Sequence, residues 1–525
     1  MGLLGEPFPD LDLPFEPVSK LLPRYAARDA DKVALVDLDQ SSRITWAELN
    51  EAASRVAVYL AEQGIGVGDK VGLLADETIE KLICWLGIWR AGACVCPLNI
   101  ELNAIYIAEM LQQIEPKLVL WHKGIDGPAL TEGVAAPDIR VDTWGADRGG
   151  SGGADSLFRL VAKLDPDDIP DIENGEDDLA AIFCTSGTTS RPKLIVHKHI
   201  GFWLSGLSTL DFLGLTADDR TLEYRSFGWN SAQILSLVPW LQKGHTLHIA
   251  KRFSHTRFFD WIQEHGITFA AGVPTVVNML LNEPTGVTAD EIPTLKRMTC
   301  STAPLTAEQW QQFEAMYGVT LLQLYGMSEA GWICGNRHYE RRMGTVGKPA
   351  KYQQFQIVDN DDNPVPAGTE GHVTIGGPQV CYGTISTDGD FEDWTGARTR
   401  TGDLAVMDAD GFIRVTGRTK DLIIRGGANI SPLEIDTIVM AHDHVAEAAA
   451  VGVPDKIYGE EVVCYLVAKP GAALDLAGVA AHCSQSLPAF KMPKNFYVVD
   501  SLPKNDRGKI LRESLKTKWL EEVGG

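Results

Sequence analysis

Hydrophobic and polar positions follow two alternating patterns over residues 1–125. Residues 45–64 and 79–92 carry apolar side chains at helical spacing, which predicts two helices, and the first ends at Gly64. Short apolar runs at 69–75 and 93–99 predict buried strands. Strands that alternate with helices are typical of a parallel sheet that is covered on both faces.

The same alternation resumes after Asp178. Further strands are predicted at 179–185, 193–199, 246–250, 267–273, 297–303 and 319–326, with helical stretches between several of them. Residues 144–154 are rich in Gly, which predicts an exposed loop.

The pattern of predicted secondary structure changes near residue 350. From about 350 to 417, short strands are separated by Gly, Pro and Asp, which predicts a smaller β-rich subdomain. After Arg418 a separate unit of strands and helices follows. The predicted fold class is therefore α/β, with a large N-terminal domain of stacked α/β sheets at 1–417 and a small C-terminal α+β domain at 418–525.

Composition and charge limit the kind of partner. The chain has 525 residues, of which 45% are hydrophobic and 22% charged, so it is expected to fold rather than to be disordered. Its 47 Lys and Arg residues against 70 Asp and Glu residues give a formal charge of −23. That charge repels phosphate polymers and anionic membranes at long range, which argues against a nucleic-acid partner. A small anion held by a few local cations remains compatible with it.

The nine cysteines are scattered and form no Cys-x-x-Cys pair. This pattern predicts buried free thiols in a reducing compartment rather than a zinc site. The acidic, Pro-rich N-terminus does not read as a signal peptide. The longest apolar stretch, 82–98, contains Arg90 and is too short to span a bilayer. We therefore expect a soluble, cytoplasmic protein without integral membrane contact.

A run of hydroxyl side chains follows the strand predicted at 179–185. In "FCTSGTTSRPKLIVHKH", Ser and Thr residues surround Gly187, and Lys193 follows. Such hydroxyls and main-chain N–H groups can surround phosphate oxygens, and a Lys adds charge. The spacing is not that of a Walker loop, and a strand follows instead of a helix. Taken alone, the run is equally compatible with a polar hairpin turn.

Three more blocks follow this run: "QLYGMSEAG" at 323–331, "RTRTGDLAVMDADGFIRVTGRTKDLIIRGGANISPLEID" at 398–436 and "LPKNDRGKILR" at 502–512. The four blocks, in this order and spacing, resemble the ANL superfamily of adenylate-forming enzymes. That superfamily contains acyl-CoA synthetases, peptide-synthetase adenylation domains and luciferases. The resemblance extends from about residue 20 to 515 and implies an AMP-forming acid–CoA ligase that uses ATP, Mg²⁺ and coenzyme A.

In the reaction that the resemblance implies, a carboxylate attacks the α-phosphorus of ATP, and the thiol of CoA then displaces AMP. A carboxylate is already ionised at neutral pH, so the first half needs positive charge rather than a general base. The resemblance assigns catalytic roles to Lys509, Glu329 and Thr185. Lys509 would bridge the carboxylate, the α-phosphate and the ribose, while Glu329 and Thr185 would hold Mg²⁺.

The resemblance also implies a nucleotide site. Asp403 would accept hydrogen bonds from the ribose hydroxyls with Arg418 nearby, and residues 301–304 and Tyr325 would enclose the adenine. The full set is Thr185, Ser186, Gly187, Thr188, Thr189, Lys193, Ser301, Thr302, Ala303, Pro304, Gln323, Tyr325, Gly326, Met327, Ser328, Asp403, Arg418 and Lys509.

By the same resemblance, the C-terminal domain is mobile and rotates about a hinge near 418–421, at Lys420. The rotation would withdraw Lys509 and bring Arg425, Gly426 and Gly427 to the site, where they would bind CoA.

The acyl pocket implied by the resemblance is built from Trp203, Trp229, Asn230, Gln233, Gly272, Val273, Pro274 and Ile333. Many members of the superfamily have a His where this chain has Trp229 and Asn230, so the acid is not predicted. Arg225 is interpreted in two ways, as a partner for a second anionic group of the substrate or as part of a structural ion pair.

Other functions remain open at this point. A stand-alone adenylation enzyme would pass the acyl group to a carrier protein or another acceptor. Amino-acid activation is disfavoured because Gly228 follows Phe227 where such enzymes usually have Asp. A luciferase-like oxygenase is a further alternative. A non-catalytic homologue that binds acyl-AMP would not need Glu329 and Lys509. A homodimer is possible, since dimers are common among relatives.

Overall fold

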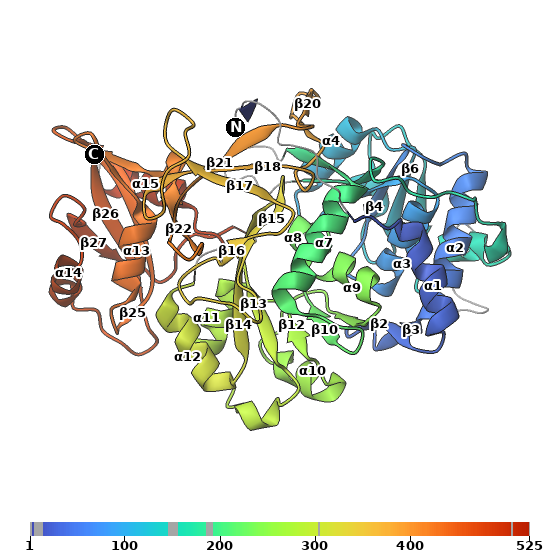
Figure 1. Ribbon diagram of the computed structural model, residues 1–525, viewed down its shortest axis with the longest axis horizontal. Coiled ribbons are helices and arrows are strands. Elements are labelled where there is room, and N and C mark those ends of the chain that lie inside the picture. The colour runs from blue at the N-terminus through green and yellow to red at the C-terminus, as the bar shows by residue number, and fades with distance from the viewer. Residues whose placement is uncertain are drawn as a thin grey trace.

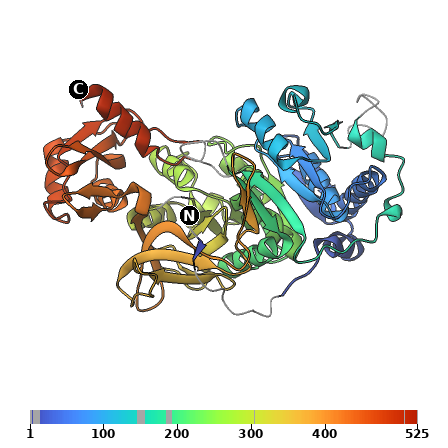
Figure 2. The same ribbon diagram turned by 90° about the horizontal axis from the view of Figure 1, so that it is seen from above.

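The computed structural model describes residues 3–4, 14–144, 156–184, 193–302, 305–505 and 508–523. A large body holds the N-terminal part of the chain, and a smaller C-terminal unit lies at one end of it (Figure 1). The view turned by 90° shows the same division, with the last helix at the outer end of the small unit (Figure 2). The expected mixed α/β fold with a large N-terminal and a smaller C-terminal domain is confirmed.

Two large sheets form the body. The first is an eight-stranded sheet in which β8, β5, β4, β6 and β7 run parallel. In spatial order its strands are β20 (Phe391–Asp393), β19 (Gly383–Ile385), β9 (Leu194–Lys198), β8 (Leu179–Cys184), β5 (Cys94–Pro97), β4 (Lys70–Leu74), β6 (Leu118–His122) and β7 (Asp138–Val141).

The second is a nine-stranded sheet that is parallel from β14 to β2. Its strands in spatial order are β16 (Lys348–Pro349), β15 (Gly331–Gly335), β14 (Thr320–Met327), β13 (Arg297–Cys300), β12 (Phe269–Ala270), β10 (Arg220–Glu223), β11 (Thr246–Ile249), β2 (Val33–Asp37) and β3 (Ser42–Thr45). The strands predicted within both sheets are found, although the one predicted at 267–273 is only two residues long.

Helices α2 (Trp46–Glu62) and α3 (Ile79–Arg90) share one hydrophobic core with strands of both sheets. The α2 helix begins at a capping box, in which Thr45 and Glu48 bond to each other's main-chain N–H. All residues of α3 are buried, as expected for a helix packed between layers. A Cβ added at Gly87 would lie 2.6 Å from Val56, so the absence of a side chain permits the close approach of the two helices.

The remaining helices of the body surround these sheets. They are α1 (Leu21–Arg28), α4 (Ala104–Ile114), α5 (Gly127–Leu130), α6 (Leu157–Val161), α7 (His199–Leu213), α8 (Asn230–Ala232), α9 (Val238–Lys243), α10 (Phe258–His265), α11 (Pro274–Asn282) and α12 (Ala307–Tyr317). A π-helical turn, Gln233–Leu237, joins α8 to α9. Of the Gly-rich loop predicted at 144–154, only Trp144 is among the described residues, and its ring packs against Phe158.

A small antiparallel sheet corresponds to the predicted β-rich subdomain. It contains β17 (Gln354–Val358), β18 (Glu370–Gly376), β21 (Arg398–Met407) and β22 (Ile413–Arg418), with β1 (Leu3–Leu4) at its edge. Strands β19 and β20 fall inside the range 350–417 but extend the eight-stranded sheet instead. β19 pairs with β9, which would otherwise be an edge strand of that sheet.

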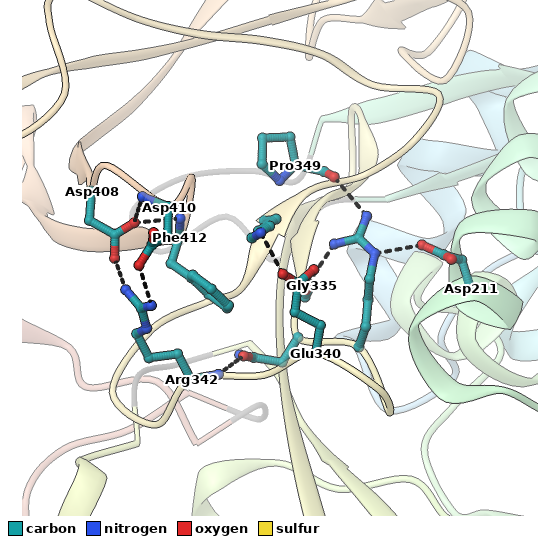
Figure 3. Close-up of polar contacts among 11 residues, drawn as sticks. Asp211, Gly335, Glu340, Arg342, Pro349, Asp408, Asp410 and Phe412 are labelled. Carbon is teal, nitrogen blue, oxygen red and sulfur yellow. Dashed lines mark hydrogen bonds and ion pairs between the residues drawn. The ribbon is translucent and has the colours of Figure 1, made fainter.

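The β21–β22 hairpin is tied to the large body at its turn. Arg342 contacts Asp408 and donates to Asp410 over 2.7 Å, while its guanidinium lies 4.2 Å from the ring centroid of Phe412 (Figure 3). In the same close-up, Asp211 and the main-chain oxygen of Pro349 accept hydrogen bonds from the guanidinium of Arg337. The contacts of Arg342 hold the hairpin against the segment that follows β15, and those of Arg337 hold the same segment against α7.

The C-terminal unit is a five-stranded sheet with three helices. It comprises β23 (Ile423–Arg425), β24 (Ala428–Ile430), β25 (Val445–Asp455), β26 (Gly459–Ala468), β27 (Asn495–Val498), α13 (Pro432–Met440), α14 (Leu476–Ser484) and α15 (Arg512–Glu522). A short 3-10 turn, Thr419–Asp421, links it to β22. Within the described residues, no helix is long and apolar enough to cross a membrane.

Candidate active site

Three predicted nucleotide residues meet where β14 ends beside the β21–β22 hairpin. The Tyr325 hydroxyl donates to Oδ2 of Asp403 over 2.5 Å, and Nε of Arg418 lies 2.8 Å from Oδ1 of Asp403. Asp403 and Arg418 are directly opposite each other in the β21–β22 register. Burial and the charge of Asp403 raise the pKa of Tyr325 well above its usual value, so the phenol stays a proton donor. The Asp403 carboxylate is thus held by two fixed donors.

Lys509 reaches this cluster from the C-terminal unit. It lies in a turn closed by a hydrogen bond from the Asn505 N–H to its carbonyl, at 2.9 Å. A Cβ added at Gly508 would lie 2.3 Å from Oγ1 of Thr275 at the start of α11, so this turn packs directly on the large body.

The electrostatic surroundings of Lys509 identify its neighbours. Burial, together with the positive charges of Arg418 and Lys420, lowers the pKa of Lys509 to about 8. Asp421 and Asp403 act in the opposite direction. The structure therefore brings together Asp403, Arg418 and Lys509. Lys509 lies more than 90 positions after the other two in the sequence. Lys420 is exposed in the linking turn.

The turn between β14 and β15 carries Glu329. Its main chain is fixed by neighbours: the Ser328 carbonyl accepts hydrogen bonds from His197 and Asn230, and the Glu329 carbonyl accepts one from the Cys381 N–H. Sequence reasoning missed His197, because a single His in an apolar strand carries no recognisable signal.

Within the described residues, no three His, Cys, Asp or Glu side chains are grouped as metal ligands. Mg²⁺ in ATP sites is held by one or two carboxylates together with phosphate oxygens. Glu329, half-buried on its anchored turn, has a carboxylate of the kind that could supply such a ligand.

Several other predicted nucleotide residues line the ends of β13 and β14. Ser301 is buried with an unpaired Oγ, and Thr302 has a φ of 79°, a conformation that L-residues rarely adopt. Gln323 is buried, and the strand register shifts between Tyr325 and Gly326. Met327 and Ser328 follow it, both half-buried. Strained backbone of this kind often occurs at binding sites.

Part of the predicted nucleotide site lies outside the described residues, namely Thr185, Ser186, Gly187, Thr188, Thr189, Ala303 and Pro304. Lys193 is described and is exposed at the start of β9.

Two predicted acyl-pocket residues present unpaired polar atoms. The Asn230 Nδ2 donates to the Ser328 carbonyl over 3.1 Å, and the Gln233 Nε2 donates to the Phe227 carbonyl over 2.7 Å. These bonds fix both amide orientations. Asn230 Oδ1 and Gln233 Oε1 are then buried without a partner. Because the two residues are three positions apart on one helical segment, their side chains lie on the same side.

The other predicted pocket residues differ in position. Gly272 lies two residues after the end of β12, and its N–H donates to Oγ1 of Thr299; Val273 is the N-cap of α11 and Pro274 its first residue. Trp229 and Ile333 are buried in separate cores. Trp203 is not brought to the site: its ring packs against Phe15, 6.1 Å between centroids, in the main core. A large apolar ring on the inward face of a helix is readily taken into the core.

Arg225 forms a structural ion pair rather than an open anion site. Its Nε and Nη2 donate to the two carboxylate oxygens of Glu223, at 2.8 and 2.6 Å, and Glu223 is fully enclosed. Ser236 donates to the same carboxylate. A bidentate pair of this kind neutralises both charges.

Among the predicted CoA residues, Arg425 makes its side-chain contacts within the C-terminal unit. Arg425 pairs with Glu461 and lies 4.4 Å from the ring centroid of Tyr458, both in the C-terminal unit. Gly426 and Gly427 have φ values of 60° and 87°, and nothing lies within 4 Å of a Cβ added at Gly427. One cavity of about 770 Å³ lies at the opposite edge of the nine-stranded sheet, beside Arg43 and Trp261, and contains no predicted site residue.

The fold is shared with known ligases. The family model described as AMP-binding enzyme matches residues 22–383, and that described as AMP-binding enzyme C-terminal domain matches residues 434–509. The chain belongs to the AMP-binding enzyme family, and the resemblance to adenylate-forming acyl-CoA synthetases is confirmed.

Individual relatives agree with the family. The chain is 30% identical to an oxalate–CoA ligase of Arabidopsis thaliana, with 96% of this chain and 99% of the relative covered. It is 30% identical to a sulfoacetate–CoA ligase of Cupriavidus necator, covering 95% and 97%. The crystal structure of ATP-bound MatB from Rhodopseudomonas palustris matches with a TM-score of 0.85 and 29% identity over 95% and 99% of the two chains. The chain is an AMP-forming acid–CoA ligase that uses ATP and CoA.

Proposed function

We propose that the cluster of Asp403, Arg418 and Lys509 is where this enzyme joins its acid to ATP. The observation that carries the proposal is the partial burial of Lys509, a residue of the C-terminal unit, within electrostatic range of the anchored Asp403 of the body. Two anions, a carboxylate and a triphosphate, must approach each other there. A buried ammonium group stabilises the charge that develops between them more strongly than an exposed one does.

The described residues support separate roles for the two carboxylates. Asp403 receives donors from Tyr325 and Arg418 on one side, and its remaining lone pairs suit the ribose hydroxyls. Glu329 would hold Mg²⁺, which when bound neutralises phosphate charge. Thr185 is proposed as the second metal ligand. Its role and that of the Ser/Thr-rich loop around it rest on the resemblance alone.

Thioester formation is proposed to require rotation of the C-terminal unit about residues 418–421, at Lys420. In the described arrangement Lys509 is half-buried, whereas in the Arg425–Gly427 segment both glycines are exposed and Arg425 is half-buried. Four apolar side chains near that segment are exposed by 44–83%: Ile424, Ile457, Tyr458 and Phe490. Apolar surface around an Arg and an open Gly suits a ligand with an aromatic base and phosphates, which supports CoA as the acceptor.

The acid is proposed to be small and polar. Asn230 Oδ1 and Gln233 Oε1 are buried acceptors without donors, and an alkyl chain would leave them unpaired at a cost of about 1–3 kcal/mol each. An acid that carries a hydroxyl or amino group satisfies them. Because Glu223 neutralises Arg225, a second acid group is not expected to be held there. The relatives named for oxalate and sulfoacetate also take small polar acids.

The experiment is a pyrophosphate-release assay over paired acids of equal length, such as 3-hydroxybutyrate against butyrate, with and without CoA. Faster release with the polar member and acyl-CoA formation would support the proposal. Preference for the alkyl member would overturn the proposed substrate class. Adenylate formation without a thioester would favour transfer to a carrier protein or another acceptor. ATP binding without any turnover would favour a non-catalytic homologue that binds acyl-AMP.

Two further properties are proposed. All nine cysteines are buried and none is in a disulfide within the described residues, which supports a reducing, cytoplasmic location. A homodimer is the expected assembly on the resemblance, and light scattering coupled to gel filtration tests it directly.

A further inference from the structure

The Glu329 turn is anchored by both large sheets. Ser328 and Glu329 lie between β14 and β15, in the nine-stranded sheet. The Ser328 carbonyl accepts from Nε2 of His197 over 2.8 Å, and the Glu329 carbonyl accepts from the Cys381 N–H over 2.6 Å. His197 is in β9, and Cys381 lies two residues before β19, so the donors come from a strand of the eight-stranded sheet and from the segment that leads into another.

His197 also contacts the strand that leads into the Ser/Thr-rich segment. Its ring stacks on Phe183, with 5.4 Å between ring centroids and 11° between their planes. Phe183 is the last residue but one of β8. His197 is only 2% exposed, so its position is set by packing on one side and by the Ser328 carbonyl on the other.

The protonation state of His197 is determined by these contacts. A carbonyl only accepts hydrogen bonds, so Nε2 must carry the proton. Burial lowers the pKa of His197 to about 4, and the bond to Ser328 opposes this shift. The imidazole is therefore neutral at physiological pH, and one tautomer is selected. Asn230 supplies a second, weaker bond to the same carbonyl at 3.1 Å.

We propose that His197 is a positioning residue that fixes the Glu329 carboxylate relative to the strand β8 and so sets the affinity for Mg²⁺-bound ATP. The proposal rests on the proposed role of Glu329 and adds a residue to it. A carboxylate that must meet a small octahedral ion tolerates little displacement. Groups that orient a metal ligand commonly change metal affinity when they are removed.

The test compares two substitutions of His197 with a matched control. His197→Phe keeps the ring on Phe183 but removes the donor, and His197→Gln places an amide donor near the position of Nε2. The control is His245→Phe, because His245 is also buried and neutral and bonds to one partner, Oγ1 of Thr221, which lies in β10 of the nine-stranded sheet.

The measurement is calorimetric binding of ATP across a Mg²⁺ titration, with no acid present. His197→Phe is expected to raise the half-saturating Mg²⁺ concentration about five- to tenfold, as for one lost buried hydrogen bond. His197→Gln should recover most of that loss. His245→Phe should stay within about twofold of the wild type, since its site is distant.

An unchanged Mg²⁺ requirement in His197→Phe, or an equal shift in His245→Phe, would overturn the proposal. So would a failure of His197→Gln to recover the affinity. Should His197→Phe not fold, Asn230→Leu removes the other bond to the same carbonyl, and an unchanged Mg²⁺ requirement there would also contradict the account. Failure of the proposed function is distinguishable, because the wild type would then bind Mg²⁺-ATP but activate no acid.

Discussion

Two surfaces of the C-terminal unit differ sharply in their surroundings. The turn that carries Lys509 packs on Thr275, and Lys509 is half-buried within range of the Asp403 charge, whereas Gly427, between β23 and β24, has open space around it. Both segments belong to one small domain that is joined to the body through residues 419–421. The contrast supports the proposed rotation, in which one surface at a time would face the site and the described arrangement would be the one suited to adenylate formation.

The largest effect is expected when Lys509 is substituted, and it concerns the rate of adenylate formation. Replacing it with Met should slow adenylate formation by about 3–4 kcal/mol, several-hundredfold, because a charge-stabilising contact is lost. Conversion of supplied acyl-adenylate and CoA to acyl-CoA should change far less, since the rotated arrangement withdraws Lys509. Single-turnover assays of the two half-reactions measure both rates.

The control for Lys509 is Lys504→Met in the same segment. Lys504 pairs with Glu447 at 2.6 Å on a partly exposed surface, and such pairs contribute about 0–1 kcal/mol. Equal losses in both half-reactions for the Lys509 variant, or an equal loss in the control, would contradict the contrast between the two surfaces.

Gly427 should show the opposite pattern. Gly427→Ala is expected to slow the CoA half-reaction about tenfold or more, because a side chain obstructs the thiol's approach and the φ of 87° disfavours it. Adenylate formation should be unchanged. Gly471→Ala is the matched control, with a φ of 75° and equally open surroundings. A loss confined to adenylation in Gly427→Ala would exclude the proposed role of this surface.

The smallest effect concerns the pH dependence. The pKa of Lys509 is lowered to about 8, so its charged form, which adenylation needs, is lost as the pH rises through that value. The kcat/KM of adenylation should therefore decline on the alkaline side. Lys420→Met removes a positive charge that lowers the pKa of Lys509, so this limb should move to higher pH. The shift should be small and should shrink with added salt, because Lys420 is exposed.

A pH–rate profile of each protein checks this prediction. A limb that stays in place in Lys420→Met at low salt, or one that moves to lower pH, would show that another group controls the alkaline decline.

Much of the fold and the chemistry was predictable because both depend on local patterns. Helix α3 and strand β8 follow from apolar spacing, and Asp403 and Lys509 lie in distinctive blocks. The partners of individual side chains left no local signal. Arg225 pairs with Glu223 only two positions away, but the sequence does not show that the two side chains point toward each other, and His197 looks like any core His. The pairing of β19 with β9 likewise depends on an open sheet edge far away in sequence.

The central claim, that one domain presents two surfaces in turn, can be tested by locking the described arrangement. A Cβ added at Gly508 would lie 3.4 Å from Cβ of Thr275, close to disulfide geometry, and the nine native cysteines are buried. In the oxidised Thr275→Cys, Gly508→Cys variant, we predict a single burst of acid-dependent pyrophosphate release without acyl-CoA, and recovery of acyl-CoA synthesis on reduction. Acyl-CoA formation by the oxidised protein at the rate of the reduced one would contradict the account.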